Sequence, residues 1–326
     1  MKVAVLGAGA WGTALALVLH RRLHDVVLWG HDATHLAEVQ RARRNERYLP
    51  GIELPADWIY ESDIRKAVAD AECAVIAVPS KAIRATTAEI SDYRGILVSV
   101  TKGIEDQTGL TMSGVVRSNV PHAQIAALSG PTLAMEVARG IPSAIVAASN
   151  ELATAQAVQG LFHSVPFRVY TSTDLLGVEL GGALKNVVAI AAGVCDGFGF
   201  GDNSKAALLT RGIGEMRRLG VACGAQAETF AGLSGLGDLT VTCFSKLSRN
   251  RGLGERLGRG EKLDAIMASS VAVAEGYPTA KSAHHLAESL AVTAPIIDEV
   301  YAVLYKAKPV AQALRDLVGR ESRSED

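Results

Sequence analysis

The first thirty residues determine more about the fold than any other stretch of the chain. Residues 2–6 (KVAVL) form an uninterrupted apolar run that is typical of a buried strand, and residues 26–30 (VVLWG) form another. Between them stand the glycine-spaced residues 7–12 (GAGAWG) and an apolar segment over residues 13–23 that predicts a helix. A G-x-G-x-x-G motif between a strand and a helix of one strand–helix–strand unit predicts a turn that binds a dinucleotide.

Each glycine of this motif has a separate expected use. Gly7 permits the tight turn, Gly9 lets the backbone approach a pyrophosphate, and Gly12 allows the helix to lie close to the strand. The pyrophosphate would then lie at the helix N-terminus, where free N–H groups and the helix dipole favour an anion. The alternative is a tight strand-to-helix turn that binds no ligand.

The end of the second strand bears on the choice of cofactor. Sites specific for NAD usually carry an acidic residue there, which binds the ribose 2′-hydroxyl. Gly30 offers no carboxylate, Asp32 lies slightly late, and His31 could face the 2′-phosphate of NADP. The sequence therefore leaves NAD and NADP open and favours the use of both. Asp32 is also well suited to cap the following helix.

Further apolar strands, with helical stretches between several of them, predict an α/β Rossmann-like, doubly wound sheet. We expect these strands at residues 73–78, 96–100, 125–128, 144–148 and 167–170. Functional residues of such sheets gather at the C-terminal ends of the strands. The turns at residues 78–80, 101–103 and 129–132 are therefore expected to face the nucleotide.

The pattern changes at about residue 175, where alternating strands and helices give way to successive helices with glycine-marked turns. A chain of 326 residues is also longer than one ordinary core fills. We therefore predict a Rossmann-like dinucleotide-binding domain over residues 1–174 and an all-helical substrate and catalytic domain over residues 175–326. No low-complexity linker separates them, which favours closely packed domains that share a cleft.

One helix of the second half contains an unexpected charge. Residues 174–196 carry apolar side chains at three- and four-residue steps, which predicts a buried helix, yet Lys185 stands among them. Lys185 could lay its apolar stem along the core and extend its ammonium group into solvent. Alternatively it is a general acid/base, because desolvation disfavours the charged ammonium form. The helix alone leaves both interpretations open.

Other polar residues stand where packing does not demand them. Asp238 follows a glycine-rich approach at residues 232–237, and Ser248-Arg249-Asn250-Arg251 follows shortly after. Arginine can bind a phosphate through two parallel N–H donors, and serine and asparagine add neutral hydrogen bonds. Lys102, in the turn after a strand, could pair with a substrate anion or polarise a carbonyl. The alternatives are a helix cap for Asp238, a solvated turn for the arginines and an ordinary loop lysine.

Charge and hydropathy exclude several classes of partner. With 33 basic and 34 acidic residues, the net charge of -1 gives no field suited to nucleic acid or anionic lipid. We find no run of eighteen apolar residues that could span a bilayer, because Glu179 and Lys185 interrupt the most apolar helix. The N-terminus does not have the pattern of a signal peptide. We expect a cytoplasmic protein with small-molecule partners and no stable membrane anchor.

The four cysteines are scattered and have no metal-ligand spacing. They stand at positions 73, 195, 223 and 243, without a C-x-x-C pair or a suitably spaced histidine. We therefore expect buried thiols, with neither a metal nor a disulfide framework. Cys195 and Cys243 could alternatively line a site.

With its motifs taken in order, the sequence resembles the bacterial-type NAD(P)-dependent sn-glycerol-3-phosphate dehydrogenases over about residues 3–320. The shared segments are GAGAWGTALA, VLWGHD, VPS, TKGIE, SGPT, GGALKN, GLGDL-x-x-TC, SRNR and VAEG. The resemblance implies a Rossmann-like domain followed by an all-α domain. It implies reversible reduction of dihydroxyacetone phosphate to sn-glycerol 3-phosphate with NAD or NADP, for glycerophospholipid synthesis. It also implies a homodimer.

The resemblance also implies roles for individual residues. Lys185 matches the general acid/base, Lys102 its companion lysine at the substrate, and Asp238 the residue that orients the ammonium group. The positions that match substrate contacts are Lys102, Gly130, Thr132, Lys185, Asn186, Asp238, Thr242, Ser248, Arg249 and Asn250. The positions that match dinucleotide contacts are Gly7, Gly9, Ala10, Trp11, Gly12, His31, Lys102, Ala134, Arg249, Val273 and Glu275.

Two positions depart from the family pattern. Ala10 stands where the family often has serine, which removes a hydroxyl near the pyrophosphate and bears on cofactor affinity. Leu133 replaces a frequent phenylalanine, which is an apolar exchange. Two other functions share parts of this plan: a β-hydroxyacid dehydrogenase, and a non-catalytic dinucleotide sensor that would need only the N-terminal half.

Overall fold

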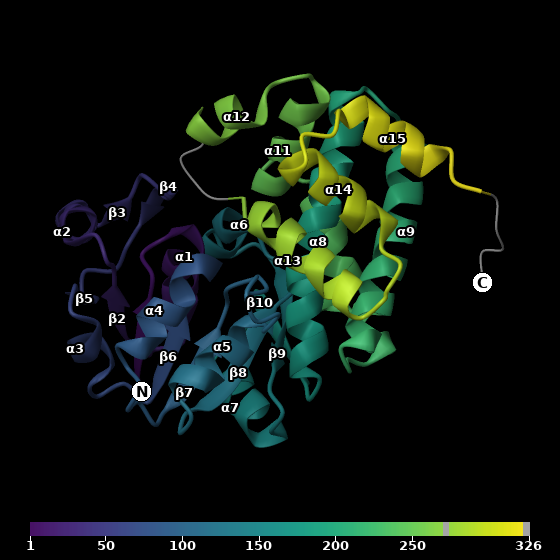
Figure 1. Ribbon diagram of the computed structural model, residues 1–326. Helices are drawn as coiled ribbons and strands as arrows, with labels where there is room; N and C mark the ends of the chain where they lie inside the picture. Colours follow the sequence, from purple (N-terminus) through teal and green to yellow (C-terminus); the bar gives the residue numbers. More distant parts are fainter. Residues whose placement is uncertain (270–273, 322–326) are drawn as a thin grey trace. The chain divides into compact units, whose positions relative to one another are not determined.

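The computed structural model describes residues 1–269 and 274–321 and divides the chain into two compact units (Figure 1). The first contains Met1–Glu105 and Leu110–Glu179. The second contains the short segment Asp106–Gly109 and the described residues from Leu180 onward. Each unit is described by itself below.

The first unit is built around an eight-stranded sheet with the order β10-β9-β8-β7-β6-β1-β2-β5. Its strands are β1 (Lys2–Leu6), β2 (Asp25–Trp29), β5 (Ile59–Glu61), β6 (Cys73–Ile76), β7 (Ile96–Ser99), β8 (Gln124–Ser129), β9 (Ser143–Ala148) and β10 (Phe167–Ser172). All neighbouring strands are parallel except β8 and β9, which are antiparallel. The predicted α/β, Rossmann-like class is therefore confirmed.

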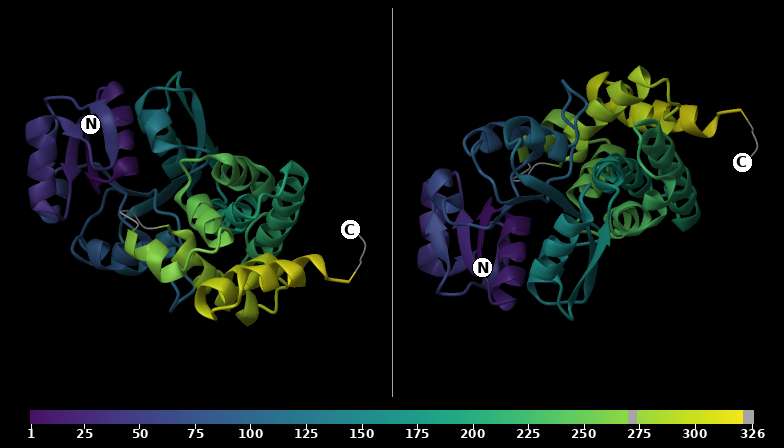
Figure 2. Two further views of the ribbon diagram at one scale, coloured as in Figure 1. Left: turned by 90° about the horizontal axis from the view of Figure 1, so that it is seen from above. Right: turned by 90° about the horizontal axis from the view of Figure 1, so that it is seen from below.

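Helices cover both faces of this sheet (Figure 2). They are α1 (Ala10–Arg21), α2 (Ala33–Ala42), α3 (Ile64–Val68), α4 (Ile83–Ala88), α5 (Met112–Asn119), α6 (Ala134–Ala138) and α7 (Leu152–Phe162), with a 3₁₀ turn at Ser80–Ala82. Val3 and Val5 of β1 pack with α1 and α7, whereas Ala4 and Leu6 pack with α3 and α5. Burial on both faces explains why this strand is an uninterrupted apolar run.

Three short strands have no sequence pattern that predicts a strand. These are β5 and the hairpin of β3 (Arg44–Asn45) and β4 (Leu49–Glu53), which pair in antiparallel fashion. The segment LPGIE contains a proline and a glycine and shows no alternation of apolar and polar residues. The predicted strands otherwise agree with the observed ones to within two residues at each end.

The regular elements described after β10 are all helical (Figure 1). They are α8 (Leu175–Gly197), α9 (Asp202–Ala222), the 3₁₀ turn η2 (Ala227–Ala231), the π-helical turn η3 (Leu233–Gly237), α10 (Asp238–Phe244), α11 (Arg249–Gly258), α12 (Leu263–Ser269), α13 (Gly276–Ser289), α14 (Pro295–Tyr305) and α15 (Val310–Val318). The predicted all-helical second half is thus confirmed for the described residues.

Helix α8 corrects one expectation about membranes. Among the described residues it alone is long and apolar enough to cross a bilayer, with a mean hydropathy of 1.5 in its best window. That window is 94% buried inside the protein, so α8 is a core helix. The polar residues that were expected to exclude a span are buried as well. Glu179 accepts a hydrogen bond from the Ser113 N–H group at 2.8 Å, and Lys185 is described below.

The four cysteines are free thiols, and the expected burial holds for three of them. Cys73, Cys195 and Cys243 are buried, whereas Cys223 is partly exposed. Burial raises the pKa of the Cys73 and Cys243 thiols to about 12.

Candidate active site

The glycine-rich turn after β1 has the geometry that its motif predicts. Gly7 has φ of +133°, and a Cβ atom there would lie 2.5 Å from the carbonyl oxygen of Ala77. A Cβ atom on Gly12 would overlap the carbonyl oxygen of Gly7, whereas one on Gly9 would meet open space. Gly7 and Gly12 therefore satisfy the fold, and Gly9 leaves room beside the helix end.

Helix α1 begins directly after Gly9. Within the described part of the chain, no side chain caps its first N–H groups, and its first turn contains no acidic residue. Ala10 and Trp11, both predicted to contact the dinucleotide, form the start of this turn and are half-buried. An uncapped N-terminus with a glycine before it can accept an external anion.

The end of β2 is surrounded by Asp32, His31 and Arg47, and of these Arg47 had no sequence signal. Asp32 caps α2 by accepting a hydrogen bond from the His35 N–H group at 3.0 Å, which confirms the capping interpretation. This hydrogen bond is the main cause that lowers the pKa of the Asp32 carboxyl group. Arg47 lies 3.9 Å from Asp32 and stacks over the ring of Tyr48. His31 is exposed beside them. A cation near this strand end can accommodate a 2′-phosphate.

The turns after β6, β7 and β8 lie at one edge of the sheet because these strands are parallel. Thr101 donates a hydrogen bond to the carbonyl oxygen of Val78 at 2.7 Å, which joins the first two turns. Lys102 Nζ lies 3.5 Å from the carbonyl oxygen of Gly130, and Thr132 Oγ1 lies 3.2 Å from the same oxygen. The structure thus brings Lys102, Gly130 and Thr132 together. Ala134 begins the short helix α6.

A buried polar cluster in the second unit surrounds Lys185. This residue is 6% exposed, and its Nζ atom lies 2.9 Å from Asp238 Oδ1 and 2.6 Å from Thr242 Oγ1. The Thr242 hydroxyl donates its proton to the Asp238 carbonyl oxygen at 2.6 Å, which directs a lone pair towards the ammonium group. The interpretation in which Lys185 reaches into solvent is therefore wrong. Asp238 does not cap a helix with its side chain either.

The local fold explains why these distant residues meet. Helix α10 starts with Asp238 directly after the π-helical turn η3, so Asp238 and Thr242 lie one turn apart on the same face. A Cβ atom on Gly181 of α8 would lie 2.8 Å from the carbonyl oxygen of Ser234 in η3. Only glycine permits this approach, one helical turn before Lys185. Single π-helical turns are frequent at functional sites.

A second polar chain begins at the neighbouring residue of α8. Asn186 and Asn250 are both buried, and the Asn250 amide donates to Asn186 Oδ1 at 2.8 Å. Asn250 Oδ1 accepts the N–H group of Gly276 at 2.8 Å. Gly193 of α8 and Gly254 of α11 bring the two helix backbones into contact, since a Cβ atom on either would overlap the other helix. This contact places Asn250 beside Asn186.

The remaining predicted residues of this unit lie at helix ends. Ser248 caps α11 by accepting the Arg251 N–H group at 3.2 Å, and exposed Arg249 is the first residue of that helix. Glu275 directly precedes α13, and Val273 lies outside the described residues. Arg251 pairs with Asp196 at 2.6 Å and with Glu255 at 3.0 Å, so it is a structural residue.

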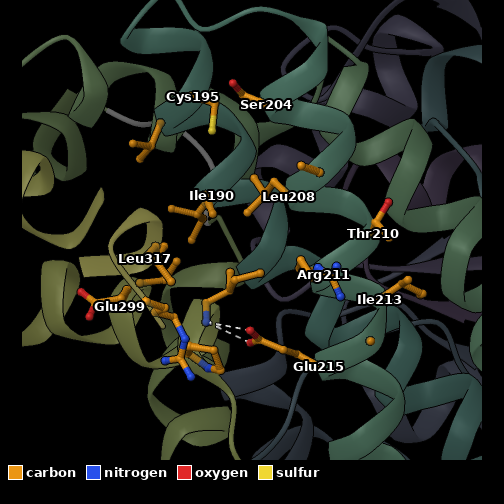
Figure 3. A pocket seen from close by; sticks show the side chains of 18 of the residues that line it. Ile190, Cys195, Ser204, Leu208, Thr210, Arg211, Ile213, Glu215, Glu299 and Leu317 are labelled. Atoms are coloured by element: carbon orange, nitrogen blue, oxygen red, sulfur yellow. Dashed lines mark hydrogen bonds between the residues drawn. The ribbon is translucent and has the colours of Figure 1, made fainter. Parts of the chain in front are cut away.

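A separate cavity of about 1290 Å³ lies in the second unit, among α8, α9, α14 and α15 (Figure 3). Glu215 lines it and accepts hydrogen bonds from the backbone N–H groups of Ile296, at 2.9 and 3.0 Å, and Ile297, at 3.3 Å. Glu215 thus caps the N-terminus of α14. Burial raises the pKa of its carboxyl group to about 7. Cys195, which was considered as a residue that could line a site, lines this cavity (Figure 3), whereas none of the described residues predicted to contact substrate or dinucleotide does.

The described residues contain no group of three or more His, Cys, Asp or Glu side chains that could hold a metal ion. The chemical groups present are an uncapped helix N-terminus, two lysines beside hydrogen-bond acceptors, and buried amides and hydroxyls. Such groups can bind anions and move a proton.

Two family patterns match almost the whole chain. The pattern described as NAD-dependent glycerol-3-phosphate dehydrogenase N-terminus matches residues 2–155, and the one described as the C-terminus matches residues 174–315. A glycerol-3-phosphate dehydrogenase [NAD(P)+] from Chlorobium phaeobacteroides is 48% identical, over 100% of this chain and 99% of its own length. The protein of the same description from Geobacter sulfurreducens is 45% identical, over 99% and 98%.

Solved structures agree with this similarity. The crystal structure of glycerol-3-phosphate dehydrogenase from Coxiella burnetii has a TM-score of 0.94 at 36% identity, covering 98% of this chain and 99% of that one. The glycerol-3-phosphate dehydrogenase from Saccharomyces cerevisiae has a TM-score of 0.84 at 25% identity, covering 98% and 99%.

Proposed function

Because the chain belongs to the family of NAD(P)-dependent glycerol-3-phosphate dehydrogenases, we propose that it works mainly in the direction of dihydroxyacetone phosphate reduction. The product, sn-glycerol 3-phosphate, then supplies the backbone of glycerophospholipids. The protein acts in the cytoplasm, as a homodimer. Residues 1–174 form the dinucleotide-binding domain, and residues 175–326 form the catalytic domain.

Lys185 is the general acid of the reduction. The observation that carries this assignment is the buried cluster in which its Nζ atom lies 2.9 Å from Asp238 and 2.6 Å from Thr242. The carboxylate pairs with the ammonium group, and both partners orient its N–H bonds. General acid/base catalysis requires a proton donor held in a fixed direction.

The reaction places negative charge on the carbonyl oxygen of the substrate. When bound in the glycine-rich turn, the cofactor would supply a hydride to the substrate C2 atom, and the carbonyl π electrons would move to the oxygen. An N–H bond of Lys185 breaks as its proton passes to that oxygen, and Lys185 is left neutral until it regains a proton from solvent. By the family resemblance, Lys102 would add positive potential at the developing oxyanion, which lowers the energy of the transition state.

The phosphate of the substrate is bound by donors at the start of α11. Arg249, the first residue of that helix, forms the charged contact, and the Asn250 amide and the Ser248 hydroxyl add neutral ones. Asn186 and Thr242 are polar neighbours of Lys185. The turn with Gly130 and Thr132, which also contacts Lys102, is assigned to the substrate by the family resemblance. Binding the phosphate orients the reacting carbonyl.

The dinucleotide is bound by the glycine-rich turn and α1. Gly9 leaves space for the pyrophosphate, and Ala10 and Trp11 present backbone N–H groups in the first turn. Because N–H groups bind the anion, the missing hydroxyl at Ala10 affects affinity more than activity. Both NADH and NADPH are used, since His31 and Arg47 can face a 2′-phosphate. The family resemblance assigns the remaining cofactor contacts to Ala134, Arg249 and Glu275.

The test compares oxidation of NADH and of NADPH with dihydroxyacetone phosphate and with dihydroxyacetone. We expect turnover with the phosphorylated ketone only. The Arg249→Ala variant should raise the KM for dihydroxyacetone phosphate by roughly 10- to 150-fold, the range for a lost hydrogen bond to a charged group.

The matched control is Arg259→Ala, which removes an exposed arginine that directly follows the same helix. This control should leave the KM unchanged. Equal losses in the two variants, or equal turnover of the two ketones, would contradict the phosphate role of Arg249. Light scattering of the purified protein tests the homodimer.

A further inference from the structure

A buried asparagine contacts the glycine-rich turn from a hairpin that the sequence analysis missed. Asn45 lies in β3 and is fully buried. Its Nδ2 atom donates one hydrogen bond to the carbonyl oxygen of Ala8 at 2.9 Å and another to Thr13 Oγ1 at 2.8 Å. Both hydrogen atoms of this amide are therefore used within the protein.

The two acceptors lie on either side of the start of α1. Ala8 stands between Gly7 and Gly9, and Thr13 is a buried residue of the first turns of α1. The N–H group of Thr13 also donates to the carbonyl oxygen of Gly9 at 3.0 Å. One amide group thus joins the glycine-rich turn to the helix that follows it.

The hairpin holds Asn45 firmly in place. The N–H group of Tyr48 donates to the carbonyl oxygen of Asn45 at 3.2 Å, and that of Leu54 donates to the carbonyl oxygen of Arg43 at 2.8 Å. Leu49 and Leu54 are buried in the same apolar core as α1. The position of Asn45 is therefore set by packing that does not involve the turn.

A turn rich in glycine gains freedom that it must lose when it binds a ligand. Asn45 holds the Ala8 carbonyl oxygen and the first turns of α1 in one arrangement, so less conformational entropy is lost when the ligand binds. We propose that Asn45 is a positioning residue that preorganises the glycine-rich turn for the cofactor pyrophosphate. This inference rests on the dinucleotide role given to the turn above.

The test replaces Asn45 with leucine, which has a similar size and no N–H donor. Without these two hydrogen bonds the turn must be ordered when the cofactor binds, so the Kd for NADH, measured by fluorescence, should rise roughly 5- to 30-fold, the cost of ordering about one residue. The value of kcat at saturating NADH should stay within about twofold, because Asn45 touches no reacting atom. Thr13→Val removes one acceptor only and should give a smaller rise in Kd.

The control is Val116→Ala in α5, which is buried in the apolar core on the other face of the sheet and does not contact the hairpin core. It should lower the melting temperature through lost apolar burial, with the Kd for NADH unchanged. An Asn45→Leu protein that is less stable but binds NADH as tightly as the wild type would overturn the inference. If that variant does not fold, an unchanged Kd in Thr13→Val has the same meaning. A wild-type protein that does not bind NADH would instead contradict the proposed function.

Discussion

The glycine-rich turn of the first unit and the lysine cluster of the second unit are built from different parts of the chain. The turn uses backbone: Gly9 leaves open space, and the first N–H groups of α1 carry no side-chain cap from the described residues. The lysine cluster uses side chains, because the Lys185 ammonium group is surrounded by Asp238 and Thr242.

This difference determines how each region should respond to substitution. A backbone site depends on the absence of atoms, so adding a methyl group harms binding without breaking a contact in the protein. A side-chain cluster depends on the presence of one group, so removing that group stops a chemical step. The three predictions that follow use this contrast.

Removing the Lys185 side chain should have the strongest effect. The Lys185→Ala variant should lose about 10²- to 10⁴-fold in kcat, the range for general acid/base catalysis. The KM for NADH should stay within about twofold, because the loss concerns the transition state. Steady-state kinetics checks both values.

Lys205→Ala is the matched control for this variant. Lys205 has 10% of its side chain exposed and pairs with Asp196, whereas Lys185 has 8% exposed and pairs with Asp238. Breaking either buried pair should cost about 3–5 kcal/mol of stability. Only Lys185→Ala should lower kcat in protein that remains folded, and equal losses would show that the effect is one of stability.

Glu215 offers a second helix N-terminus for comparison with that of α1. Its own carboxylate already occupies the N-terminus of α14, so substitution should change stability and not ligand binding. Burial raises its pKa from 4.5 to about 7. The folded protein therefore binds the proton more tightly than the unfolded chain does, and this stabilisation is present below pH 4.5 and lost as the pH rises through 7.

The expected loss in the free energy of unfolding is about 3 kcal/mol, because the pKa shift from 4.5 to about 7 corresponds to about 1.36 kcal/mol for each pH unit. Urea unfolding at several pH values should show this loss in the wild type. In the Glu215→Gln variant, the free energy of unfolding should not show this decrease as the pH rises. An unchanged slope in the variant would assign the pH dependence to other groups.

Gly9→Ala tests the backbone region and should have the mildest effect. Its φ of −83° suits alanine, and the added Cβ atom would meet no protein atom within 4 Å. The melting temperature should therefore hardly change. The Kd for NADH should rise roughly 5- to 150-fold, since crowding a filled space by one methyl group costs about 1–3 kcal/mol.

Gly12→Ala is the contrasting variant at the same turn. Its Cβ atom would overlap the carbonyl oxygen of Gly7, so this variant should lose stability. Thermal unfolding and NADH titration of both proteins separate the two cases. A Gly9→Ala protein that is destabilised but binds NADH with normal affinity would contradict the role of Gly9 in leaving space for the cofactor.

The same contrast explains how far the sequence could predict the structure. The turn after β1 was predictable because the strand, the glycines and the helix are adjacent in the chain. The apolar pattern changes from that of a strand to that of a helix and back within thirty residues. Lys185 could be recognised as unusual, but its contacts with Asp238 and Thr242 span 53 and 57 positions. No local pattern reports such a pairing, and only the family resemblance indicated it.

The hairpin of β3 and β4 shows the other limit. Its first strand has two residues, and the second contains Pro50 and Gly51, so neither has a strand-like pattern. Asn45 therefore looked like part of a polar loop. Its hydrogen bond to Ala8 spans 37 positions, and only the folded chain reveals it.

The burial of the cysteines sets how the protein reacts with electrophiles and oxidants. With a pKa of about 12, Cys73 and Cys243 hold almost no thiolate near neutral pH, and the thiolate is the reactive form. Cys195 is buried as well, which leaves Cys223 as the partly exposed thiol. A maleimide dye should therefore label the native protein at Cys223 first, and oxidation during storage without a reducing agent should begin at the same thiol.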